Sequence, residues 1–147
     1  MRFMIFRKAD AQTEAGAMPT EEMLRVMGDY MKEISDAGVL LGGEGLKPTS
    51  HSARVKFTNG KARVIDGPFA ETKELVAGYL LLEANSIDEA IGWAKKWPAL
   101  DMEGNVELEI RPLFEEDDFG EEFTPQLRKQ EADMRAKAAS KQQEPAR

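Results

Sequence analysis

Apolar positions along the chain follow two spacings, one typical of strands and one typical of helices. Alternating or continuous apolar residues predict strands at 2–7, 76–82 and 106–114, of which 76–82 is long enough to be central. Apolar residues recur three and four positions apart over 20–37, which predicts a helix. A shorter helix is predicted over 86–97, where a capping box begins the element and a proline follows it.

A β-hairpin is predicted between the two helices. Residues 53–57 alternate between apolar and basic side chains, and residues 62–66 alternate again. Asn59-Gly60 between them is a strong hairpin signal, because both residues readily adopt the left-handed backbone that such a turn requires. The second strand of this hairpin ends at Asp66.

The predicted order of elements is β-α-β-β-β-α-β, in which the hairpin supplies two strands. This order favours an α+β fold of ferredoxin-like plan, with helices on one face of a largely antiparallel sheet. The open face of that sheet is too apolar to remain in water, so we expect a partner to cover it. A second copy of the chain is the simplest partner, which predicts a homodimer.

Composition narrows the classes of function. The 147 residues suffice for one domain, and their net charge of −7 disfavours nucleic acid and anionic membranes as partners. The chain has no cysteine and a single histidine, His51, which excludes disulfides, thiolate nucleophiles and the usual zinc motifs. We therefore expect no metal and no cofactor. The missing cysteines and the absence of a signal peptide fit a cytoplasmic protein.

The C-terminal part differs in charge from the rest. We expect a domain over residues 1–114, followed over 115–147 by an acidic linker and a helical tail. Six acidic residues fall between 115 and 122, and the segment 125–147 has a net charge of +3. Thr124-Pro125 is typical of a helix start. A solvated and partly frayed tail is the alternative.

The turn after the hairpin places two carboxylates close together in sequence. Asp66-Gly67-Pro68 ends the strand, because Pro68 disfavours a helical backbone at Gly67. Phe69 and Glu71 follow directly. Two neighbouring carboxylates, Asp66 and Glu71, would form a general acid–base pair. In the alternative interpretation Asp66 caps the turn and Glu71 is solvated.

Two further groups of residues suit a ligand. Glu44 lies among glycines, and backbone of this kind approaches a ligand closely, although a flexible connector explains it equally well. Basic side chains around the hairpin, including Lys73, would hold an anion, unless they form the wet face of the strand pair. The histidine His51 lies in a polar link and is expected to be exposed.

The string Asp66-Gly67-Pro68-Phe69-Ala70-Glu71-Thr72-Lys73-Glu74, with Gly42-Gly43-Glu44-Gly45-Leu46 ahead of it, resembles the DGPF branch of the YCII-related proteins. The resemblance runs from Met1 to about Phe114, and residues 116–120 resemble a longer subgroup with a charged tail. It implies ferredoxin-like subunits that pair by their sheets as a dimeric α/β barrel.

The resemblance also implies a function. For the wider family, the resemblance suggests a pocket that contains a His–Asp pair. The family includes a lyase that degrades chlorinated aromatics. Asp66 of this chain would correspond to the aspartate of the pair. The first helix, 20–37, holds no histidine in this chain. Related domains occur beside sigma factors, which implies a regulatory role as an alternative.

The sequence thus predicts a pocket near the DGPF turn that binds a small molecule, with lyase-like or hydrolase-like acid–base chemistry. Asp66 and Glu71 are the candidate catalytic residues. The candidate ligand-binding residues are Glu44, Gly45, Phe69 and Lys73. The alternative is a dimeric binding or regulatory module without chemistry.

Overall fold

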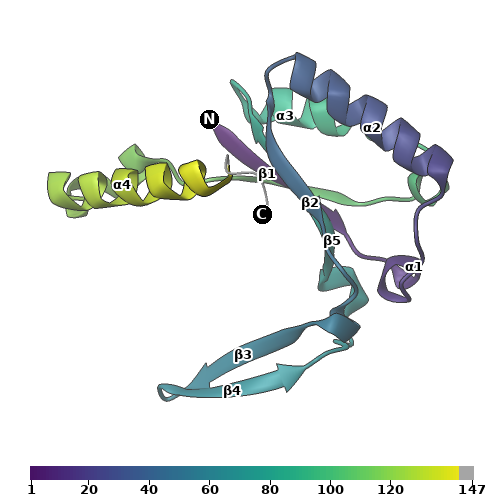
Figure 1. The fold of residues 1–147 in the computed structure, drawn as a ribbon, viewed down its shortest axis with the longest axis horizontal. Helices are drawn as coiled ribbons and strands as arrows, with labels where there is room; N and C mark the ends of the chain where they lie inside the picture. Colours follow the sequence, from purple (N-terminus) through teal and green to yellow (C-terminus); the bar gives the residue numbers. More distant parts are fainter. Residues whose placement is uncertain (143–147) are drawn as a thin grey trace. The chain divides into compact units, whose positions relative to one another are not determined.

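The computed structural model describes residues 1–142 and contains a four-stranded antiparallel sheet. Its strands, in spatial order, are β2 (Leu40–Gly45), β5 (Val76–Glu83), β1 (Arg2–Lys8) and β6 (Leu108–Pro112). Figure 1 shows helices α2 (Glu21–Asp36) and α3 (Ile87–Ala94) on one face of this sheet. The predicted α+β class with an antiparallel sheet is confirmed.

The core lies between the sheet and these two helices. Side chains of β1 and β5 that share the helix-covered face are paired across the strands, Phe3 with Leu82 and Ile5 with Leu80. All four are buried, and Ile34 of α2 is fully buried in one cluster with Ile5, Leu80 and Leu82. The period-two pattern of the strands therefore selects the face on which the helices pack.

Strand β2 was not among the predicted strands, because its glycines carry little strand propensity. The chain there is not a connector but pairs with β5 from Leu40 to Gly45. A side chain on Gly43 would come within 2.6 Å of Leu80 and 2.7 Å of the Tyr79 carbonyl. Glycine at this position permits the two strands to approach, and the prediction of a flexible connector was wrong.

The predicted hairpin is present, but it lies outside the main sheet. Strands β3 (Ala53–Thr58) and β4 (Lys61–Asp66) pair only with each other, as a two-stranded sheet. Asn59 and Gly60 both adopt positive φ angles, 49° and 76°, as the hairpin turn requires. The hairpin is thus an insertion between β2 and β5, which it was not predicted to be.

Short helical segments join these strands. Helix α1 (Ala11–Glu14) follows β1, and the Asp10 side chain caps it by accepting the N–H groups of Gln12 and Thr13. The 3₁₀ turns of this region are η1 (Thr49–His51), η2 (Thr72–Glu74) and η3 (Asp101–Gly104). Within residues 1–142, no helix is both long and apolar enough to cross a membrane.

The chain divides into two compact units, Met1–Leu113 and Phe114 onward. The second unit contains the 3₁₀ segment η4 (Glu116–Glu122) and helix α4 (Pro125–Gln142), which begins where the sequence predicts a helix start. Arg128 of α4 donates to the carbonyl of Phe123 and the carboxylate of Glu116, and so holds η4 against α4. The last five residues of the predicted tail lie outside the described residues.

Candidate functional site

The DGPF turn, residues 66–69, packs closely against the 3₁₀ turn η1. The Gly67 N–H donates to the carbonyl of Ser52 at 2.9 Å. A Cβ atom on Gly67 would lie 1.7 Å from the carbonyl oxygen of Thr49, so no residue other than glycine fits here without displacement. The Gly67–Pro68 peptide bond is cis. The backbone that follows Asp66 is therefore held by direct contact with η1.

Thr49 is the centre of a small hydrogen-bond network beneath the turn. It is buried, and its hydroxyl donates to Glu14 Oε2 at 2.6 Å while its N–H donates to Glu14 Oε1 at 3.2 Å. The same hydroxyl accepts the N–H of Phe69 at 3.0 Å. A charged acceptor makes these bonds stronger than neutral ones, so Glu14 of α1 anchors the turn.

The ring of Phe69 is also in contact with a cationic side chain, that of Arg54. The Arg54 guanidinium lies 3.8 Å from the ring centroid, within the range of a cation–π interaction. Phe69 is half-buried, whereas Arg54 is exposed on β3. This contact therefore joins the DGPF turn to strand β3, in addition to the backbone hydrogen bond from Gly67 to Ser52, the residue before β3.

The two predicted catalytic carboxylates are exposed on either side of this turn. Asp66 is the last residue of β4, and Glu71 directly precedes η2. Within residues 1–142, neither carboxylate makes a side-chain hydrogen bond or ion pair that would hold it in a structural role. The Glu71 carbonyl accepts the N–H of Glu74 at 3.0 Å.

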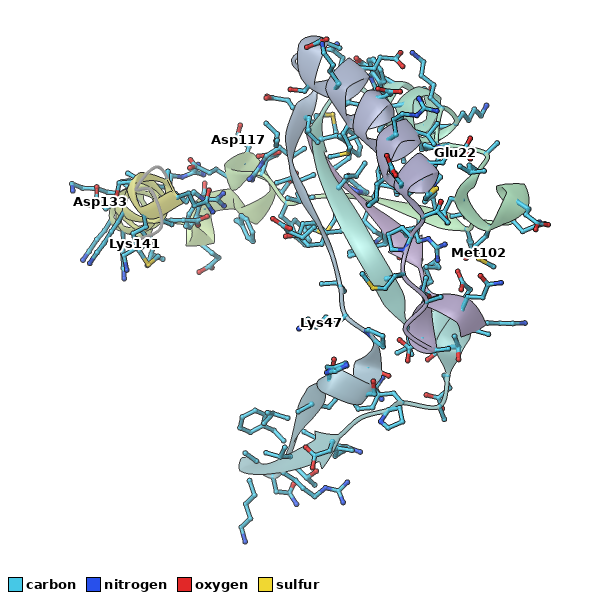
Figure 2. The ribbon with its side chains drawn as sticks, turned by 45° about the vertical axis from the view of Figure 1, so that its right-hand side comes forward. Glu22, Lys47, Met102, Asp117, Asp133 and Lys141 are labelled. Atoms are coloured by element: carbon cyan, nitrogen blue, oxygen red, sulfur yellow. The ribbon has the colours of Figure 1, made fainter. Side chains whose placement is uncertain are left out.

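The other predicted ligand residues come from two places. Lys73 lies in η2, two residues after Glu71, and is exposed. Glu44 and Gly45 lie on edge strand β2, where they pair with Tyr79 and Gly78 of β5. Figure 2 shows Lys47 on the link that joins β2 to η1, the 3₁₀ turn against which the DGPF turn packs. His51 is exposed in η1, next to the Ser52 whose carbonyl bonds Gly67.

Two hollows in the described residues lie away from the DGPF turn. Both are open and shallow, one at the start of α2 beside Thr20 and Arg25 and one along α4 beside Met134. Neither is lined by a predicted site residue. Residues 1–142 contain no group of three or more acidic or histidine side chains that could hold a metal ion.

Sequence reasoning missed a buried ionic cluster at the end of β1. Arg7 is buried, and it donates to both carboxylate oxygens of Asp101, at 3.1 and 2.7 Å, and to Asp10. The indole N–H of Trp97 donates to Asp101 at 2.9 Å. One signal could have revealed this cluster. Arg7 follows Phe3 and Ile5 at intervals of two residues, and in a strand this spacing places its side chain on the same face as theirs, toward the core.

The charges of this cluster alter its titration. Burial lowers the pKa of Arg7, and hydrogen bonds to Asp101 and Asp10 outweigh burial, so the pKa lies above its usual value. Burial raises the pKa of Asp10, but the Thr13 N–H and Arg7 outweigh it and hold the pKa below its usual value. Arg7 and Asp10 therefore remain ionised in the folded protein at neutral pH.

Comparison with known proteins assigns the family. Residues 1–114 match the YCII-related domain, and the chain belongs to this family, as the sequence predicted. An uncharacterised protein of Rhizobium meliloti (strain 1021) is 34% identical over 105 residues, which cover 69% of this chain and 84% of that protein.

This chain also has a more distant similarity to a solved structure. It is the 5-chloro-2-hydroxyhydroquinone dehydrochlorinase from Burkholderia phenoliruptrix AC1100, in complex with 2,5-dihydroxybenzoquinone. The TM-score is 0.42 at 15% identity, and the match covers 78% of this chain and 96% of that one.

Proposed function

We propose that this protein binds a small molecule at the DGPF turn and that Asp66 and Glu71 act there as an acid–base pair of lyase or hydrolase type. The observation that carries the proposal is the contrast between backbone and side chains. Gly67 and Phe69 are held by η1, whereas the two carboxylates are exposed and unpaired within residues 1–142. A turn fixed in this way presents its carboxylates to a ligand with little ordering on binding.

The surroundings of the turn favour an aromatic or anionic ligand. The Phe69 ring offers an apolar surface, and the cations of Arg54 and Lys73 lie on the elements that flank it. Glu44 and Gly45 of β2 would complete the contacts from the main sheet. A carboxylate that takes up a proton is suited to proton abstraction, and the neighbouring cations would favour release of an anionic leaving group.

We further propose that the protein is a homodimer of ferredoxin-like subunits. The face of the main sheet opposite the helices carries Met4 and Phe6 of β1 and their cross-strand partners Leu81 and Tyr79 of β5. These side chains are only half-buried within one chain. A second copy would cover them at an isologous contact. Light scattering that gives a mass near 16.4 kDa at micromolar concentration contradicts this proposal.

The binding proposal is tested by soaking crystals with small anionic and aromatic compounds and by following amide shifts of the same compounds in solution. We expect density and shift changes at Asp66 and Phe69. Asp66→Asn should abolish them, and Asp88→Asn, an exposed residue of α3, is the matched control. Equal binding by both variants would rule out a site at Asp66.

A second candidate function is a dimeric binding or regulatory module without chemistry. It is favoured by helix α2, which contains no histidine to pair with Asp66. A ligand that binds but is never converted would support this alternative. Turnover that Asp66→Asn abolishes and Asp88→Asn preserves would exclude it.

A further inference from the structure

One face of the β3–β4 hairpin carries positive charge and no negative charge. Side chains two residues apart in a strand share a face, and so do residues that are opposite each other in the register. The remaining positions of this face are Thr58 and Ile65. Its four cationic side chains are all exposed, and we call the face that they form the basic hairpin face: Arg54, Lys56, Lys61 and Arg63.

Two members of this face differ from most other arginines of residues 1–142. Ion pairs with carboxylates are formed by Arg7, Arg25, Arg111, Arg128 and Arg135. The side chains of Arg54 and Arg63 make no hydrogen bond or ion pair within residues 1–142, although the chain has 27 acidic residues. The fold therefore places these two guanidinium groups away from every described carboxylate.

Lys56 and Arg63 are directly opposite each other in the hairpin. The Cβ atoms of such a pair lie about 5 Å apart, and like charges at this spacing destabilise a strand pair. A two-stranded sheet is marginal in water, so it tolerates this repulsion poorly. An anion bound between the two side chains would replace the repulsion with attraction.

Arg54, on the same face, is held in position by an aromatic ring. Its guanidinium lies over the Phe69 ring, 3.8 Å from the centroid, and the Phe69 N–H is bound by the Thr49 hydroxyl at 3.0 Å. Stacking occupies the flat face of a guanidinium and leaves the N–H groups in its plane free to donate. Arg54 therefore presents oriented donors beside Lys56 and loses little freedom when it binds an anion.

We propose that the basic hairpin face binds the phosphate monoester of a small molecule. A phosphate monoester has about two negative charges at neutral pH, and its oxygens accept from several directions, so it can bind Arg54, Lys56 and Arg63 together. A monocarboxylate would neutralise only one of these three charges.

The range of electrostatic forces favours a small ligand over an extended anionic surface. At physiological ionic strength, charges are screened beyond about 8 Å, so the cations of the hairpin govern the binding of a small anion. A membrane or a nucleic acid would also meet the rest of a chain whose net charge is −7.

Glycerol phosphate is the probe, titrated into the protein at constant ionic strength while backbone amide shifts are followed. We expect saturable shifts at Arg54, Lys56 and Arg63, and roughly tenfold weaker binding of acetate. Arg63→Gln should weaken the binding of glycerol phosphate roughly fivefold, the contribution of one exposed ion pair. This variant relieves the repulsion of Lys56, so the hairpin should remain folded. Arg25→Gln removes the same charge from an exposed position on α2 and should bind as wild type does.

Phe69→Leu tests whether the ring positions Arg54. The variant changes no charge, so we expect roughly threefold weaker binding of glycerol phosphate in the wild-type background and no further loss in the Arg54→Gln background. Equal losses in the two backgrounds would show that the ring does not position Arg54.

The proposal is overturned if glycerol phosphate gives no saturable shifts, if it binds Arg63→Gln as tightly as wild type, or if acetate binds equally well. In the first case, titration with anionic vesicles and with a DNA oligonucleotide shows whether the face binds an extended anion instead. The site uses neither Asp66 nor Glu71, so it stands independently of the proposed function. Asp66→Asn should bind glycerol phosphate as wild type does, and a loss of binding in that variant would place the anion at the acid–base pair instead.

Discussion

The Thr49 hydroxyl donates to Glu14 at 2.6 Å, and this bond joins the 3₁₀ turn η1, on which the DGPF turn packs, to helix α1. The same hydroxyl accepts the Phe69 N–H. On the other side, Glu14 belongs to α1, whose capping residue Asp10 is bound by buried Arg7. A series of polar contacts therefore runs from β1 to the turn. The backbone on which Asp66 stands is positioned by residues distant in sequence.

Replacement of Thr49 by valine removes the hydroxyl without changing the shape of the side chain. Glu14 then loses a donor and Phe69 an acceptor, so we expect a loss of about 1–3 kcal/mol in the free energy of unfolding. Urea denaturation measures it, and Thr49→Ser, which retains the hydroxyl, is the control. Equal stability of the two variants would show that the hydroxyl does not anchor the turn.

The close contact at Gly67 makes a second prediction. Gly67→Ala introduces a Cβ atom 1.7 Å from the Thr49 carbonyl, and the turn must move. We expect a destabilisation of about 1–3 kcal/mol, typical of overpacking, with amide shift changes at Phe69. Gly42→Ala is the matched control, because no atom lies within 4 Å of its added Cβ. Urea denaturation measures the loss of stability. A denaturation midpoint of Gly67→Ala equal to that of wild type would contradict this close contact.

Removal of Arg7 should be strongly destabilising. In Arg7→Met the partly buried carboxylates of Asp101 and Asp10 lose their buried cation, and breaking a buried pair costs about 3–5 kcal/mol. Lys8→Met, one residue later on the opposite face of β1, should change stability far less. Chemical denaturation measures the free energy of unfolding of both variants. Similar decreases in Arg7→Met and Lys8→Met would mean that the cluster contributes no specific stability.

Asp10 makes stability depend on pH at the acidic end. Its folded-state pKa lies below the value of 3.8 for the free side chain, so between the two the unfolded chain binds more protons. The stabilisation is complete above the unfolded pKa and is lost as the pH falls through the folded one.

Asp10→Asn preserves an oxygen that can cap α1 but removes the charge. We expect a smaller difference in unfolding free energy between about pH 6 and about pH 3 than in wild type. The difference does not vanish, since hydrogen bonds from Asn85 also lower the pKa of Glu89. An identical slope in Asp10→Asn and in wild type would contradict the prediction.

Local patterns predicted most of the elements. The spacing of apolar residues located α2, α3 and three strands of the main sheet, and Asn59-Gly60 located the hairpin turn. Strand β2 was missed because a stretch rich in glycine has no propensity that marks it as a strand. Only its contact with β5, where Gly43 meets Leu80, makes it one.

The candidate site was predictable in part. The string at 66–74 located the turn and its carboxylates, because turn chemistry depends on adjacent residues. The support beneath the turn was not predictable, since Glu14, Thr49 and Phe69 are separated by 35 and 20 residues along the chain. Contacts over such distances leave no periodic signal in a single sequence.

The sequence by itself thus determined the α+β class, the hairpin and the DGPF turn, because all of these follow from short-range patterns of polarity and turn residues. The family was indicated separately, by the resemblance of the string at 66–74. Only the tertiary structure decided that the hairpin stands apart from the main sheet, that Arg7 is buried between two aspartates, and that Thr49 holds the turn. The physical reason is common to these three: strand partners and buried ion pairs are selected by packing between segments distant along the chain.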